Sequence, residues 1–141
     1  MFKRLRNQRG AALIETAITL PLVLLVSVSI FEFGRAYQTW QVLTNAAREG
    51  ARVAVLEGYT DADVSGIVSN YLTGGKLTNA AAAKITVVRN EPFGTKTASR
   101  ITVSYPFNFM VLGPVARLVR GGSKVGTALT MQSSALMRNE Q

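Results

Sequence analysis

The first third of the chain contains a long apolar run. Residues 11–31 hold 21 positions with Glu15 as the single charged residue. A helix of this length, at ~1.5 Å per residue, spans about 31 Å and matches the ~30 Å hydrocarbon core of a bilayer. The run therefore predicts a membrane-spanning helix. Pro21 inside it removes one backbone donor and predicts a bend. Three nearby hydroxyl residues are available for local bonding of the freed carbonyl: Thr19, Ser27 and Ser29.

Beyond residue 31 the pattern becomes periodic. Apolar or small residues recur three or four positions apart, as on one face of an α-helix. They are Phe33, Ala36, Tyr37, Trp40, Leu43, Ala47, Gly50, Ala51 and Ala54. Tyr37 and Trp40 lie just past the span, so they either face the membrane interface, where aromatics are favoured, or pack against the folded domain. The pattern predicts that the membrane helix continues to about residue 57, as one helix of roughly 45 residues with an amphipathic second half.

A strip of small residues lies on the same helix. Ala46, Gly50 and Ala54 are four residues apart, and such strips let another element approach closely. A glycine inside a helix costs about 1 kcal/mol relative to alanine, so Gly50 is expected to serve a close contact. Two partners remain open, the chain's own sheet, which is favoured, and a neighbouring subunit.

Residues 58–141 carry the pattern of a small α+β domain. Thr60 and Asp63 have the spacing of a capping box, and a second helix is expected to end at Gly74 and Gly75. Its apolar face comprises Val64, Ile67, Val68, Tyr71 and Leu72.

Three β-rich runs follow, at residues 83–90, 99–107 and 125–137. Each run ends in turn-forming residues, which predicts an antiparallel meander packed on the long helix. The fold class expected is therefore α+β, a long N-terminal helix, half transmembrane and half amphipathic, packed on a small antiparallel sheet of about three strands. The connector 107–122, "FNFMVLGPVARLVRGG", is unusually apolar. It is either a loop that covers the core, with a short helix at 115–119, or an exposed subunit-docking patch.

Composition limits the chemistry available to the 141 residues. There is no Cys and no His, which excludes disulfides, thiol nucleophiles, imidazole catalysis and the usual zinc sites. The sequence also lacks a phosphate-binding loop of the Walker type. We therefore expect no enzymatic activity, no cofactor and no metal.

The net charge of +8 is concentrated at the N-terminus. Half of it comes from four residues among the first ten: Lys3, Arg4, Arg6 and Arg9. A basic arm can bind nucleic acid, but this one adjoins an apolar run, where positive residues mark the cytoplasmic end of a span. The charge pattern thus favours a membrane protein with a cytoplasmic N-terminus and an external C-terminal domain, and no nucleic-acid partner.

Three interpretations of the N-terminal segment compete. It is a secretory signal peptide cut near residue 30, an uncut single-span anchor, or a segment cut between Gly10 and Ala11. Glu15 weakens the first, because a charge is unfavourable in the apolar part of a signal peptide. In the third, the new α-amine of Ala11 is protonated near neutral pH. It pairs with Glu15 of an adjacent subunit, and such a buried pair fixes register more than it adds stability.

The ordered motifs resemble those of a known family. A basic leader, Gly10 and an apolar span with Glu15 five residues later resemble the class III signal sequence of type IV pilins and pseudopilins. With Pro21, "EFGR" at 32–35 and "AAREGAR" at 46–52, residues 8–55 are similar to TadE-like minor pseudopilins of tight-adherence (Tad/Flp) pilus systems. "ITVSYPF" at 101–107 is also similar to that family, whereas Thr16 stands where the family usually has an aromatic residue.

The resemblance implies a function in assembly of a Tad-type (type IVc) pilus. It implies a leader, residues 1–10, cut by a prepilin peptidase after Gly10, a helix at 11–57 and an external domain at 58–141. The implied partners are that peptidase, other pilins and pseudopilins, an inner-membrane assembly platform and the lipid bilayer of the bacterial inner membrane. The alternatives are an uncut single-span envelope protein with an external binding domain and a binding domain secreted after signal-peptide cleavage.

Overall fold

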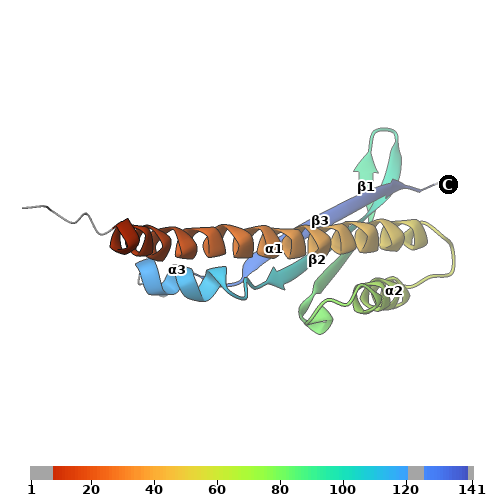
Figure 1. Cartoon of the computed structure of the whole chain (residues 1–141). Helices are drawn as coiled ribbons and strands as arrows, with labels where there is room; N and C mark the ends of the chain where they lie inside the picture. Colours follow the sequence, from red (N-terminus) through yellow and green to blue (C-terminus); the bar gives the residue numbers. More distant parts are fainter. Residues whose placement is uncertain (1–7, 121–125, 140–141) are drawn as a thin grey trace, which may run out of the picture.

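The computed structural model describes residues 8–120 and 126–139. Most of the predicted leader, the first residue of the strand expected at 125–137 and the end of the connector 107–122 lie outside these residues. The elements are α1 (Gln8–Ala54), α2 (Asp61–Gly74), a 3₁₀ turn η1 (Ala80–Ala82), β1 (Lys84–Phe93), β2 (Lys96–Phe107), α3 (Leu112–Arg120) and β3 (Leu129–Arg138). Figure 1 shows one long helix with the smaller elements gathered along it.

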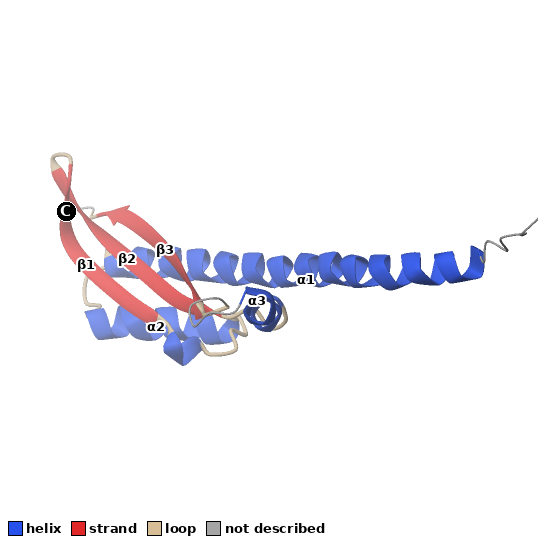
Figure 2. Ribbon diagram, turned by 90° about the vertical axis from the view of Figure 1, so that its left-hand side faces the viewer, coloured by secondary structure: helices blue, strands red, loops and turns tan. Residues whose placement is uncertain are grey.

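The long N-terminal helix is confirmed. α1 has 47 residues, is apolar enough near the N-terminus to cross a membrane, and ends at Ala54, three residues before the predicted boundary. The side chains of residues 11–27 are exposed, and in Figure 2 this half of α1 extends away from the sheet and α2. The partition into leader, helix and external domain stays a prediction.

α1 continues through Pro21 as one helix, and the bend expected there stays a prediction. The hydroxyls that were available for bonding the freed carbonyl bond other carbonyls instead. Thr19 Oγ1 donates to the Glu15 carbonyl oxygen at 2.9 Å. Ser27 and Ser29 likewise bond carbonyls four residues earlier in the helix. None of these three bonds reaches Ala17, whose carbonyl would accept from residue 21, because each hydroxyl folds back along its own turn.

The predicted second helix is confirmed, with its capping box. The Asp63 N–H donates to Thr60 Oγ1 at 3.2 Å, and the Thr60 N–H donates to the Asp63 carboxylate at 2.9 Å. Val64, Val68 and Leu72 are buried, but Tyr71, expected on the same face, is exposed.

The helix ends at Gly74 with Gly75 as its C-cap residue, as predicted. The next residue, Lys76, is left-handed at φ 56°. Gly75 permits close packing on α1, because a Cβ there would lie 2.5 Å from Val42 Cγ1.

The sheet is the predicted antiparallel meander, in the order β1-β2-β3. β1 and β2 extend further toward each other than expected, so the hairpin tip is only Gly94-Thr95. Pro92 lies within β1, which is an edge strand, where a missing N–H is tolerated. On β2 the side chains alternate, and four of them face the helices as part of the core: Ile101, Val103, Tyr105 and Phe107. One face of the sheet therefore packs on α1 and α2 (Figure 2).

The buried face of α1 differs from the face that hydrophobic periodicity predicts. Ala36, Leu43, Ala47, Ala51 and Ala54 are buried as expected. Phe33, expected on that face, is exposed instead (62%). Tyr37 (61%) and Trp40 (45%), for which packing on the domain was one of two alternatives, are exposed as well. Polar residues take their place, namely Glu32 and Thr39. Burial of these polar residues is tolerated because both are hydrogen-bonded. The Thr39 hydroxyl donates to the Arg35 carbonyl oxygen, and the Glu32 carboxylate accepts from the Val111 N–H of the connector.

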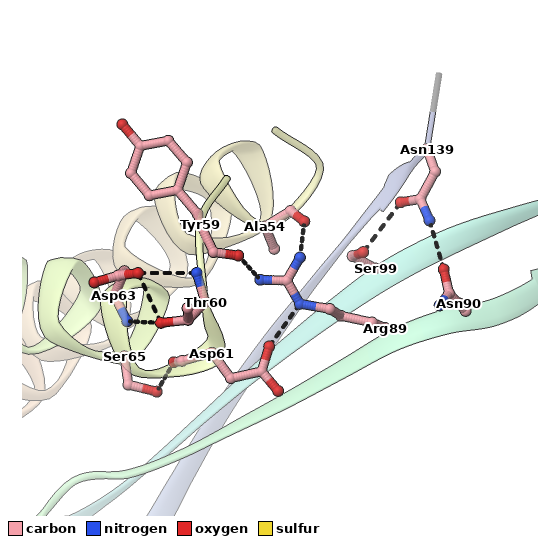
Figure 3. A network of polar contacts seen from close by, with 10 residues as sticks. All are labelled: Ala54, Tyr59, Thr60, Asp61, Asp63, Ser65, Arg89, Asn90, Ser99 and Asn139. Atoms are coloured by element: carbon pink, nitrogen blue, oxygen red, sulfur yellow. Dashed lines mark hydrogen bonds and ion pairs between the residues drawn. The ribbon is translucent and has the colours of Figure 1, made fainter. Parts of the chain in front are cut away.

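Arg89 of β1 contacts both the end of α1 and the start of α2 (Figure 3). Its guanidinium donates to the carbonyl oxygens of Ala54 at 2.8 Å and Tyr59 at 2.9 Å, and it pairs with the Asp61 carboxylate. Because the last carbonyls of a helix lack partners inside it, a cation on Ala54 completes the end of α1. This contact fixes where α1 stops and α2 begins.

Candidate functional site

Glu32 lies one residue beyond the apolar run and is 1% exposed. Its carboxylate accepts a hydrogen bond from the Val111 N–H at 2.8 Å and pairs with Arg35 at 3.2 Å. Val111 immediately precedes α3. A buried carboxylate is tolerated only with such partners. Glu32 therefore fastens the start of α3 to the exit of the apolar run.

Arg35 holds the preceding part of the connector. Its guanidinium donates to the Asn108 carbonyl oxygen and lies 4.7 Å from the centre of the Phe107 ring, as in a cation–π contact. The ring of Phe109 is edge-on to Phe107 at 5.1 Å and to Phe33 at 6.0 Å. The charged ends of the "EFGR" motif thus clamp residues 107–111 to α1, and we call Glu32 and Arg35 with these contacts the exit clamp.

The environment of Glu32 also sets its ionisation. Burial alone raises the pKa of its carboxyl group, but the hydrogen bond from the Val111 N–H and the pairing with Arg35 outweigh burial and hold the pKa below its usual value. The folded protein therefore favours the charged carboxylate, which the clamp requires.

This shift predicts a stability change at acid pH. A carboxyl group with a lowered pKa stabilises the fold above its unfolded pKa of ~4.3, and that stabilisation is lost as the pH falls through the folded value. The stability advantage of the wild type over Glu32→Gln should be present at pH 7 and shrink below about pH 4. Thermal denaturation of both proteins in detergent across this range measures it. An advantage that stays constant with pH would contradict the clamp.

The small-residue strip faces the interior of the domain. Ala46, Gly50 and Ala54 are all buried. A Cβ built on Gly50 would lie 2.5 Å from Val68 Cγ2 of α2 and 3.2 Å from Ile101 Cγ2 of β2. The glycine therefore lies where α1, α2 and the sheet meet. In this chain the strip packs against its own domain.

The predicted processing residues lie at the start of α1. Gly10, Ala11 and Glu15 are part of the helix, and the latter two are exposed. Within the described ranges, no contact of the Glu15 carboxylate with another side chain is found. Thr16, the departure from the family pattern, donates from its hydroxyl to the Ala12 carbonyl oxygen at 2.9 Å. It is thus satisfied within its own helix.

α1 presents a second, outward apolar surface. The exposed fraction is 71% at Leu13, 70% at Ile30 and 62% at Phe33, and the exposed aromatics continue to Tyr37 and Trp40. We call the exposed apolar side chains of α1 from Leu13 to Trp40 the outer stripe. It is available to other helices or lipid, while the opposite face of α1 from Glu32 onward packs on the domain.

Arg35 borders a cavity of about 360 Å³ that is also lined by Gln38, Lys76 and Asn79. Among residues 8–120 and 126–139, no group of three or more His, Cys, Asp or Glu could hold a metal.

The exit clamp is the feature that the sequence pattern missed. Glu32 and Arg35 were recognised only as part of a family motif, and Glu32 fell outside the apolar face. Glu32, Ala36, Thr39 and Leu43 have the spacing of one helix face. This spacing could have indicated the buried face if a carboxylate with a partner is counted among the buried residues.

Comparison with known proteins supports the resemblance for part of the chain. The family model described as "TadE-like protein" matches residues 10–52. This range covers the predicted cut site, the apolar run, the exit clamp residues of α1 and most of the small strip. The match confirms the resemblance over α1 and does not extend to the sheet. Comparison with curated proteins and with solved structures gives no match.

Proposed function

We propose that this protein is a minor pilin or pseudopilin needed for assembly of a Tad-type pilus. The observation that carries the proposal is that α1 is exposed on all sides over residues 11–27 and packs one face on the domain further along. Its inner face packs on the domain from Glu32 to Ala54, whereas the outer stripe from Leu13 to Trp40 is left uncovered. Such a helix can cross a bilayer and then pack beside other apolar helices without unfolding its own domain. The match of α1 to the TadE-like model supports the same role.

In this proposal the chain is a subunit and a peptidase substrate, not an enzyme. It is a single-pass protein of the bacterial inner membrane, with the basic leader in the cytoplasm and the α+β domain outside. Its partners are the prepilin peptidase, other pilins and pseudopilins of the same system, the assembly platform and the bilayer. The motor force comes from partner proteins.

Processing is proposed to occur between Gly10 and Ala11. Residues 8–10 are helical and continuous with α1, so the peptidase must unwind the first turn. This is a small cost, because the first four N–H groups of a helix have no partner within it. The α-amine of Ala11 then becomes available to Glu15 of an adjacent subunit. The exposure of Glu15 supports a partner outside the chain.

Gly10→Glu should block this step. A charged side chain replaces a residue that lets the backbone adopt an extended form in a protease cleft. We expect the longer precursor to accumulate, as a slower band on an immunoblot of cells that contain the peptidase. Gln8→Ala serves as the control and should be processed normally. Complete processing of Gly10→Glu would count against cleavage at this site.

Glu15→Ala should separate processing from assembly. The cut site is intact, so the mature form should appear, but the ion pair that sets subunit register is lost. We expect far fewer pili, counted by electron microscopy, at an unchanged level of mature protein. Thr16→Ala is the matched control, since the Thr16 hydroxyl bonds within its own helix. A normal pilus number with Glu15→Ala would eliminate the pairing role.

One observation favours the second candidate, an uncut single-span envelope protein with an external binding domain. The helix runs without interruption from Gln8 across the proposed cut site. That candidate predicts Met1 as the N-terminus and no effect of Gly10→Glu.

A further inference from the structure

We propose that α3 lies on the membrane, with its apolar side chains inserted among the lipids of the outer leaflet. This inference rests on the proposed insertion of α1 in the bilayer. It gives the protein a second lipid contact, formed by the connector rather than by the span.

The first observation is the exposure of α3. Leu118 is 88% exposed and Val119 is 81% exposed. Val111 and Val115 precede Val119 at four-residue steps and are also exposed, at 44% and 36%. Side chains at this spacing lie on one side of a helix. α3 therefore presents an apolar face that its own domain does not cover.

The second observation is where α3 begins. The Val111 N–H is hydrogen-bonded to Glu32, which directly follows the end of the apolar run at Phe31. Both views place α3 beside α1 and away from the tip of the β1–β2 hairpin (Figures 1 and 2). α3 thus starts at the level where α1 leaves the bilayer.

The third observation is that α3 is held in place. The Arg117 guanidinium donates to the Gly126 carbonyl oxygen at 2.6 Å. Gly126, at φ +73°, approaches the Gly113 carbonyl so closely that a Cβ would collide with it. With the exit clamp at one end and Gly126 alongside, the apolar face of α3 has a fixed position. The exposed apolar face therefore belongs to a helix that is held by contacts with the rest of the domain.

These observations favour lipid over a protein partner. Ile30 and Phe31, the last residues of the apolar run, are 70% and 69% exposed. Val111, just before α3, is bonded to Glu32, the residue that follows them. The exposed face of α3 therefore starts at the level of α1 where the apolar run ends. A helix with one apolar side at the polar–apolar boundary is the arrangement expected for an interfacial helix. A partner protein would have to displace lipid from this level to reach Leu118.

The test uses single cysteines, because the chain has none. Leu118→Cys, Leu22→Cys and Leu56→Cys each replace an exposed leucine, in α3, mid-span and beyond the end of α1. The full-length proteins carry an environment-sensitive fluorophore at the cysteine. They are placed in phosphatidylcholine–phosphatidylglycerol vesicles at low protein density. Lipids with a nitroxide just below the headgroup, or deep in the acyl chain, act as quenchers. Matching thermal denaturation of the three variants shows that each is folded.

We expect the Leu118 probe to emit at shorter wavelength than the Leu56 probe and to lose fluorescence with the shallow nitroxide. The Leu22 probe should be quenched more by the deep nitroxide, and the Leu56 probe by neither. A Leu118 probe that behaves like the Leu56 probe overturns the inference while leaving the span intact. A Leu118 probe that changes only at high protein density also overturns it, in favour of contact between copies. If the Leu22 probe is not quenched, the result instead contradicts the proposed membrane span.

Discussion

Gly50→Leu should lower the free energy of unfolding of the folded α+β domain by about 3 kcal/mol, the upper range for overpacking a closed core. Even a Cβ at this position would meet Val68 Cγ2 at 2.5 Å and Ile101 Cγ2 at 3.2 Å. Both neighbours are completely buried, and their branched side chains have few alternative rotamers. A leucine can be accommodated only if α1 moves away from α2 and β2.

The measurement is thermal or urea denaturation of the full chain in detergent, followed by pulse proteolysis. Gly50→Ala should fall between the wild type and Gly50→Leu, because the clash offsets the helix propensity gained. Gly66→Ala is the matched control. It lies within α2 with open space around its Cβ position, so it should gain up to about 1 kcal/mol. Wild-type stability of Gly50→Leu would show that α1 does not pack against α2 and β2 at this point.

Glu32→Ala should release the connector from α1. Hydrogen bonds to charged groups contribute about 1.5–3 kcal/mol, and this substitution removes both the one to Val111 and the pairing with Arg35. We expect a loss of about 2–3 kcal/mol. Amide hydrogen exchange should be faster at Val111 and through α3, while α2 changes little.

Two variants sharpen this result. Glu32→Gln keeps an acceptor for the Val111 N–H but removes the charge that faces Arg35, so its effect should be intermediate. Glu49→Ala removes the other i,i+3 pair of α1, with Arg52, whose side chain is 60% exposed. Such surface pairs contribute ~0–1 kcal/mol, so Glu49→Ala should change little. Equal effects of Glu32→Ala and Glu49→Ala would contradict a clamp at Glu32.

Elements with local signals could be predicted from the sequence. The apolar run, the capping box at Thr60 and Asp63, and the alternating runs of the sheet each carry their pattern within a few residues. The meander order was predicted because each strand-like run ends in turn-forming residues. A two-residue tip joins β1 to β2, whereas a longer connector that contains α3 joins β2 to β3. Strand ends were less certain, since Pro92 normally argues against a strand and is accepted here only at a sheet edge.

Long-range contacts could not be predicted. Glu32 is buried because it meets the Val111 N–H, 79 residues later. Without that partner, a carboxylate on a helix is expected to face water. Hydrophobic periodicity therefore placed Phe33, Tyr37 and Trp40 inside and Glu32 outside. The helix expected at 115–119 in the connector was real but longer, and its exposure depends on where the exit clamp holds it.

The close contact at Gly50 could be predicted from the sequence. A glycine inside a helix lowers helix stability relative to alanine, and a close contact with another element offsets that loss. Gly10, Ala11 and Glu15 were identified because the basic leader, the glycine and the glutamate occur in the order and spacing of a class III signal sequence. Their roles concern a peptidase and a neighbouring subunit, which one chain does not contain, and they stay proposals.

The central claim is that the mature protein begins at Ala11. N-terminal sequencing of the protein purified from cells that contain the prepilin peptidase tests it directly. We predict Ala11 as the first residue, with residues 1–10 removed. Met1 at the N-terminus would contradict processing and favour the uncut anchor. An N-terminus near Ile30 would instead indicate signal-peptide cleavage and a secreted domain.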